Sequence, residues 1–262
     1  MAQPGRKTAA FEYHSPEGGR DELASVVRVL YLNNIGTLAG MQELQQVMRS
    51  NADIQRVFFI TTQKALVIRA EPPRVAMAEW LVQELDRPAQ PGRKTAAFEC
   101  HSPDGRDALA SAVRVLYLNN IGTPPGMQEL QVLVRSGAEI PRVFGITAQK
   151  ALVIRAERVA MAEWFVEQVD RPAEPGRKPA SYQYHPPGSG SSGLETAARV
   201  YYPAHITAPP AALALEREIR TTAGIPRVFY CSESGTLAFR GTPEAVARAE
   251  KLIADEDRPG AQ

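Results

Sequence analysis

The sequence predicts an α+β protein of three tandem β-α-β-β-α modules, each a three-stranded sheet with two helices on one face. The main observation is a repeat: the segment 56–88 returns as 142–172 and, more loosely, as 227–259. Each copy reads as two short strands, a tight turn and a helix that stops at Asp-Arg-Pro. A strand and a helix also recur upstream of each copy, and the simplest arrangement covers one sheet face with both helices.

The repeat also sets the domain boundaries. Each module has about 65 residues, near the lower limit for a self-sufficient core, so we expect modest stability from a single module. Phe11-Glu12-Tyr13 alternates like a short extended segment, which leaves an extra edge strand open. The modules span 23–88, 109–172 and 195–259, with linkers over 1–22, 89–108 and 173–194 and a tail over 260–262.

The amino-terminal string AQPGRKTAAFE at 2–12 occurs again at 89–99, directly after the first module. Residue 1 therefore stands where a linker would be. We expect the chain to be an excised piece of a longer protein with an added methionine, in which case missing targeting signals say nothing about location.

The first strand of module one is expected over 26–32 (VVRVLYL), because it is β-branched and aromatic and turn formers follow it. A helix is expected over 38–50, where Met41, Leu44 and Met48 share one face. The strand recurs over 112–118 and 197–202, and the helix face recurs as Met127, Leu130 and Val134 and as Ala212, Leu215 and Ile219.

The next two strands are expected over 56–61 and 65–70. In the first of them Phe59 changes to Gly145 and then to Tyr230, a swing in volume that a packed core would resist. The flanking positions stay apolar in all three copies. We therefore expect Phe59 and Tyr230 to face outward, on a surface open to contacts. The residues expected inside are Phe58, Ile60, Leu66 and Ile68.

The last helix of module one is expected over 73–85 and ends at Asp86-Arg87-Pro88, because helices rarely continue through the residue before proline. Met77 and Trp80 lie one turn apart beside its core stripe. Module two repeats them as Met161 and Trp164, whereas module three has Arg248 and Lys251.

A position that accepts charge in one copy is at the surface there, so the Met/Trp pairs form an exposed apolar patch that marks a contact. The other reading is that each tryptophan covers the edge of its own core. The partner in a contact would be the adjacent module or another chain.

The sequence offers no constellation for chemistry, so we expect no enzyme, metal or cofactor. His14, His101 and His185 lie in linkers, and the GSGSSG string at 188–193 reads as a flexible loop, because a dinucleotide site needs it between a strand and a helix. The two cysteines, Cys100 and Cys231, stand at non-equivalent positions, which argues against a disulfide framework or a metal pair.

Charge is balanced, with 30 Lys+Arg against 29 Asp+Glu, so no basic excess favours phosphate binding. We expect neither nucleic acid nor a small-molecule substrate as a partner. No apolar run reaches the roughly 18 residues of a membrane span.

Module three resembles the repeated amino-terminal modules of secretins, called secretin N-domains or NolW-like domains. The matching residues are Leu237–Glu244 (LAFRGTPE), the following AVARAEKLI, and Asp257-Arg258-Pro259. Modules one and two match through Leu66–Ala70 and Leu152–Ala156 (both LVIRA) and through their Asp-Arg-Pro ends. The resemblance covers nearly all of the chain outside the linkers.

The resemblance implies a KH-like fold, also called a ring-building motif, and a periplasmic location. It implies homo-oligomeric rings at an outer-membrane secretion or pilus channel, with adjacent modules, like subunits and other secretion-system proteins as partners. We therefore expect non-catalytic modules that mediate ring assembly or docking. The alternatives are a stand-alone envelope scaffold and KH-like nucleic-acid binding. The turn after the first strand lacks the Gly-x-x-Gly loop that KH modules use.

Overall fold

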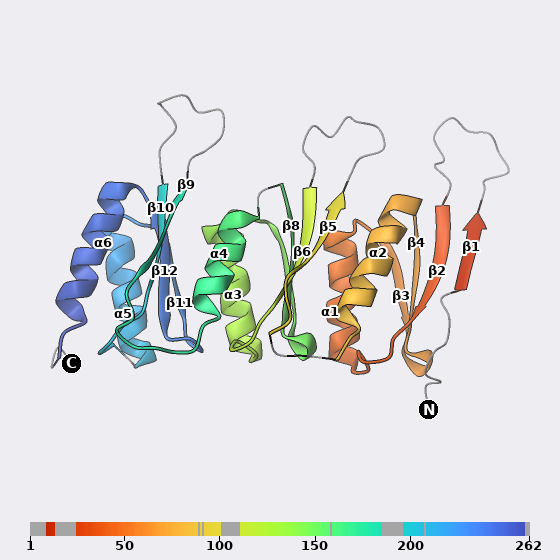
Figure 1. The fold of residues 1–262 in the computed structure, drawn as a ribbon, viewed down its shortest axis with the longest axis horizontal. Helices are drawn as coiled ribbons and strands as arrows, with labels where there is room; N and C mark the ends of the chain where they lie inside the picture. The colour runs from red at the N-terminus through yellow and green to blue at the C-terminus, as the bar shows by residue number, and fades with distance from the viewer. Residues whose placement is uncertain are drawn as a thin grey trace, which may run out of the picture. The chain divides into compact units, whose positions relative to one another are not determined.

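The computed structural model describes residues 9–13, 25–88, 90, 92–100, 111–157, 159–184, 196–206 and 208–259 (Figure 1). The first module consists of β1 (Ala9–Tyr13), β2 (Ser25–Tyr31), α1 (Leu38–Asn51), β3 (Arg56–Ile60), β4 (Ala65–Ala70) and α2 (Pro72–Leu85). The second consists of β5 (Ala96–Cys100), β6 (Ser111–Tyr117), α3 (Pro124–Gly137), β7 (Arg142–Ile146), β8 (Ala151–Ala156) and α4 (Ala160–Val169). The third consists of β9 (Ala180–Tyr184), β10 (Thr196–Tyr201), α5 (Pro209–Glu218), β11 (Arg227–Cys231), β12 (Thr236–Gly241) and α6 (Pro243–Glu256).

The α+β class and the repeated β-α-β-β-α order are confirmed. Each sheet has four antiparallel strands, in the orders β1-β2-β4-β3, β5-β6-β8-β7 and β9-β10-β12-β11. The fourth strand comes from the linker before each module and pairs with the module's first strand, as Phe11 opposite Val27 shows. The extra edge strand that the sequence left open is therefore present, and each sheet is one strand wider than the three predicted.

The chain divides into two compact units. The first comprises Met1–Tyr117 and Arg142–Glu157, and the second comprises Leu118–Pro141 and Arg158–Gln262. Each unit thus contains the helix pair of one module together with the sheet of the module that follows it.

In the first unit, α1 and α2 lie between two sheets (Figure 1). One side of the helix pair packs on its own sheet, where Val57, Leu66 and Ile68 are buried. The other side packs on the sheet of β5 to β8, where Val115 and Val153 are fully buried in the same core. Both sides of the helix pair are therefore removed from water, one by each sheet. Burial against both sheets contributes to the hydrophobic stabilisation of this unit.

In the second unit, the sheet of β9 to β12 has helices on both faces, with α5 and α6 on one and α3 and α4 on the other (Figure 1). Successive side chains of a strand point to opposite faces. Along β12, every residue from Thr236 to Arg240 is buried. The face that the module's own helices leave bare is therefore covered by the preceding helix pair.

The prediction of which strand residues face the core is confirmed for Leu66 and Ile68 of β4, which are fully buried, but it was wrong for β3. Phe58 and Ile60 are 64% and 43% exposed, whereas Val57 is buried and Phe59 packs against the core. Directly paired residues share a face, and Phe59 stands opposite Leu66. Tyr230 likewise lies in the core of its own module.

The reason for the error lies in the later modules. The equivalents of Ile60 are Ile146 and Cys231, which are 0% and 2% exposed. These positions are apolar because the outer face of a sheet is itself buried where a helix pair covers it. An apolar residue in all three copies therefore does not distinguish the two faces.

The aspartate of Asp-Arg-Pro binds the loop that follows the second strand of each four-stranded sheet, which is β2, β6 or β10. The carboxylate of Asp86 accepts hydrogen bonds from the backbone N–H groups of Asn33, Asn34 and Ile35, at 2.6, 2.8 and 2.8 Å. Asp170 and Asp257 do the same in the other modules. The motif therefore ends the last helix of the module. It also fixes the carboxyl end of that helix to the loop that leads into the module's first helix.

Candidate interaction surface

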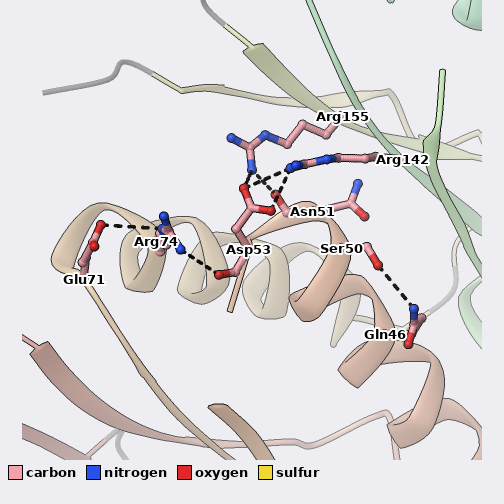
Figure 2. A network of polar contacts seen from close by, with 8 residues as sticks. All are labelled: Gln46, Ser50, Asn51, Asp53, Glu71, Arg74, Arg142 and Arg155. Atoms are coloured by element: carbon pink, nitrogen blue, oxygen red, sulfur yellow. Dashed lines mark hydrogen bonds and ion pairs between the residues drawn. The ribbon is translucent and has the colours of Figure 1, made fainter. Parts of the chain in front are cut away.

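A carboxylate beyond the end of α1 is held by two arginines of the next module's sheet (Figure 2). The carboxylate of Asp53 lies 2.9 Å from Nη1 of Arg142 on β7 and 2.6 Å from Nη1 of Arg155 on β8. The same Nη1 of Arg155 donates to the backbone carbonyl of Asn51, at 2.8 Å. The end of α1 is therefore fixed to two neighbouring strands at once.

Asp53 occupies a strained backbone position. Its φ is +54°, in the left-handed region that costs an ordinary L-residue about 1–2 kcal/mol. The equivalent residue of module three is Gly224, with φ +71°. Module one thus keeps an acid where glycine would fit without strain, and the ion pairs with the two arginines offset that cost.

A second carboxylate of α1 binds the hairpin turn of the next sheet. Glu43 accepts hydrogen bonds from the backbone N–H and the hydroxyl of Thr147, at 3.1 and 2.9 Å. Thr147 begins the short 3-10 turn between β7 and β8. Both ends of the hairpin formed by these strands are therefore bound by acids, Glu43 within α1 and Asp53 just after it.

The second helix contacts the next sheet through aromatic and polar groups. Trp80 of α2 packs on Phe98 of β5, with ring centroids 5.4 Å apart. Glu84 accepts from the hydroxyl of Tyr117 at 3.1 Å and from Arg93 at 2.7 Å, and the Arg93 guanidinium lies 4.1 Å from the centroid of the Tyr117 ring. Burial, opposed by Arg93 and assisted by Glu84, raises the pKa of Tyr117, so its hydroxyl remains a donor.

The second unit repeats this joint, by which we mean one module's helix pair resting on the next module's sheet. Glu139 replaces Asp53, again in the left-handed region with φ +59°. Its carboxylate lies 2.6 Å from Arg227 and 3.3 Å from Arg240, and Arg240 also donates to the carbonyl of Gly137 at 3.1 Å. Burial acts to raise the pKa of Glu139, but Arg240 and Arg227 outweigh it and the pKa is lowered.

The remaining contacts recur as well. Glu129 of α3 accepts from the backbone N–H and the hydroxyl of Ser232, at 2.7 and 2.8 Å. Trp164 of α4 packs on Tyr182 of β9, with centroids 5.4 Å apart. Tyr202 donates to the backbone carbonyl of Gln168 at 3.1 Å. The contacts described so far use equivalent positions in the two joints, although the chemistry at Gln168 differs from that at Glu84. The second joint has a further contact: Glu233 accepts hydrogen bonds from the backbone N–H of Gly122 and the hydroxyl of Thr123, at 3.0 and 2.6 Å.

The residues predicted to form an interaction surface fall into two groups. Met77 and Met161 are buried, and their tryptophans lie partly buried against β5 and β9, the strands from the linkers. Phe59 and Tyr230 lie on strands, on the sheet face that packs against the helices of their own module. They are therefore not on the outer face where the sequence placed them. That the Met/Trp pairs bind another protein stays a prediction.

Sequence reasoning missed the acids of the joint. A signal was present: the two arginine positions are the same in all three copies, as Arg56 and Arg69, Arg142 and Arg155, and Arg227 and Arg240. The acids are present in only two of the three copies. Taken one position at a time, such an acid looks like a charge that faces solvent.

Among the described residues, no group of His, Cys, Asp and Glu could hold a metal ion, and no helix is long and apolar enough to cross a membrane. Cys231 is a free, buried cysteine, and burial raises the pKa of its thiol to about 12. His14, His101, His185, the 188–193 loop and the Cys100 side chain lie outside the described residues.

No protein-family model and no curated protein matches the chain. Among solved structures, the chain is similar to Aeromonas hydrophila ExeD, a secretin, with 14% identity and a TM-score of 0.20. The match covers 89% of this chain and 41% of that one, so this chain spans about two fifths of the ExeD chain.

Proposed function

We propose that the chain is a non-catalytic interaction protein whose modules assemble by resting a helix pair on a neighbouring sheet. The observation that carries this proposal is the repetition of the joint. Asp53 and Glu139 each hold an arginine pair, and Trp80 and Trp164 each cover an aromatic side chain of the next module. Because equivalent residues make the same contact twice, further modules with those residues could form it too. This property is expected of a protein that assembles with other modules.

The setting we propose is a secretion or pilus system of the cell envelope. The support is the resemblance of the LAFRGTPE segment, the LVIRA strands and the Asp-Arg-Pro ends to secretin N-domains. On this reading the chain works in the periplasm near the outer membrane. Its partners are like subunits in a ring or other proteins of the secretion system.

KH-like nucleic-acid binding remains the competing function, favoured by the shared strand and helix order. Four arginines that could meet phosphates, Arg142, Arg155, Arg227 and Arg240, are engaged by carboxylates of the chain itself. With a net charge of +1, little cationic surface is left to hold a phosphate backbone.

The experiment is expression of the tagged chain in its own host, followed by fractionation of the envelope and cross-linking. We expect the chain in the periplasmic fraction, cross-linked to a subunit of an outer-membrane secretion channel. A cytoplasmic chain, or one that shifts a nucleic-acid probe in a gel at low salt, would contradict the proposal.

A further inference from the structure

The outer face of the first sheet has the same residues that receive a helix pair in the other two modules. Its arginine pair is Arg56 and Arg69, and the residue that begins its hairpin turn is Thr61. The equivalents in module two, Arg142, Arg155 and Thr147, bind Asp53 and Glu43. The equivalents in module three are Arg227, Arg240 and Ser232, which bind Glu139 and Glu129.

Within the described part of the chain, no helix covers the apolar part of this face. Phe11 and Phe58 are each 64% exposed and Ile60 is 43% exposed. In the covered sheets, Ile146 is fully buried and Cys231 is 2% exposed. Neighbouring Val27, Val29 and Val67 are half-buried, whereas their equivalents Val113, Val115 and Val153 are fully buried. Contiguous apolar groups exposed beside an arginine pair indicate a binding surface.

The chain's own last helix pair does not have the complementary groups. Where α1 has Glu43 and Asp53, module three has Ala214 and Gly224. The Met/Trp positions of α2 are Arg248 and Lys251 in α6, and both are cationic like the arginines of the open face. A second copy of this chain is therefore a poor occupant.

We propose that the open face binds the helix pair of a further module of the same β-α-β-β-α type, outside residues 1–262. The bound module's first helix bears two carboxylates ten residues apart, at the positions of Glu43 and Asp53, and its second helix bears an apolar Met/Trp pair. The inference rests on the proposed assembly function and names the partner of that joint. Charge complementarity with Arg56 and Arg69 selects such a helix pair over that of module three.

The test supplies the missing groups on a full-length chain. The donor probe has Ala214→Glu, Gly224→Asp, Arg248→Met and Lys251→Trp, together with Phe58→Asp, which blocks its own open face. The acceptor is the unaltered chain. Sedimentation velocity of the equimolar mixture should show a one-to-one complex of donor and acceptor, a species that neither chain forms alone.

Matched controls localise the contact. An acceptor with Arg56→Glu should bind the donor probe roughly tenfold more weakly or worse, because a helix carboxylate then meets like charge. A second donor keeps Ala214 and Gly224 but has the other three substitutions of the donor probe. It should bind the acceptor more weakly by a similar factor. Circular dichroism and thermal unfolding of every variant check that the modules remain folded.

A mixture no heavier than its folded components would overturn the inference. So would self-association of the unaltered chain that Phe58→Asp abolishes, since a second copy would then be the occupant. Binding of the donor probe in a protein that never reaches the periplasm would contradict the proposed function and leave the inference standing.

Discussion

The carboxylate of Asp53 lies 2.6 Å from Nη1 of Arg155, across 102 residues of sequence. The contact joins a strained left-handed residue just after one module's helix to the central strand β8 of the next module. Its counterpart joins Glu139 to Arg240. Because the two acids stand at equivalent positions, the joint is a property of the repeat and not of one chance contact.

Trp80 contributes to the joint more than to its own sheet. Trp80→Asp should leave the first module folded, because the core positions of α2 are untouched, but should cost about 2–4 kcal/mol through lost burial against Phe98. Urea unfolding followed by hydrogen exchange is the measurement. Faster exchange should be confined to β5 and its neighbours. Lys251→Asp at the exposed equivalent position is the control and should change stability by no more than about 0.5 kcal/mol. Unfolding of the whole first module would show that Trp80 belongs to that module's core.

Cys231 reports on the second joint. Burial raises the pKa of its thiol to about 12, so almost no thiolate is present at neutral pH and alkylation requires opening. In a Cys100→Ser chain, Cys231 should react with iodoacetamide at least roughly a hundredfold more slowly than in urea.

The companion variant is Glu129→Ala, which removes the hydrogen bonds to Ser232 beside the cysteine. It should speed alkylation, while Glu43→Ala in the first unit should not. Equal protection in all three proteins would mean that α3 does not cover Cys231.

Glu139 makes the second joint sensitive to acid. Its folded-state pKa is lowered, so its contribution to stability is fully present above its unfolded pKa and is lost as pH falls through the lower, folded value. The difference in unfolding free energy between the wild type and Glu139→Gln should therefore be largest near neutral pH and should close in acid. Urea titrations at several pH values measure it. A difference independent of pH would show that the Arg227 and Arg240 contacts add nothing specific to the charged form.

Asp86 stabilises its module by capping three backbone N–H groups. Asp86→Ala leaves the N–H groups of Asn33, Asn34 and Ile35 without their acceptor and should cost about 2–4 kcal/mol. Asp86→Asn keeps one acceptor oxygen and should cost less. Thermal unfolding ranks the variants, and the same order is expected at Asp257. If Asp86→Ala leaves the thermal stability unchanged, the Asp-Arg-Pro motif only ends the helix and does not stabilise the loop.

Much of the fold follows from local sequence. The stripe of Met41, Leu44 and Met48 and the stop at Pro88 predict the helices well, because both depend on neighbours in the chain. The strand faces could not be predicted in the same way. When both faces are buried, an apolar residue at Ile146 or Cys231 looks like core whichever side it occupies.

The contacts of the joint are harder still to predict. Asp53 and Arg142 are 89 residues apart, and an isolated acid after a helix looks like a solvated charge. The Met/Trp pairs are visible in the sequence because module three has Arg248 and Lys251 at their positions. The acids show the same pattern, with Ala214 and Gly224 as replacements, and comparing whole sets of positions between copies would have shown both losses together.

The most direct test of the account is a double-mutant cycle on Asp53. In the wild type, Asp53→Gly should lower the unfolding free energy by about 1–2 kcal/mol, because the lost arginine contacts outweigh the relief of backbone strain. In an Arg142→Met/Arg155→Met background the same change should raise it, by about 0.5–1 kcal/mol. Lys64→Gly, at another left-handed position, should have one sign in both backgrounds. If Asp53→Gly has the same effect with and without the two arginines, the helix of one module is not held on the sheet of the next in this way.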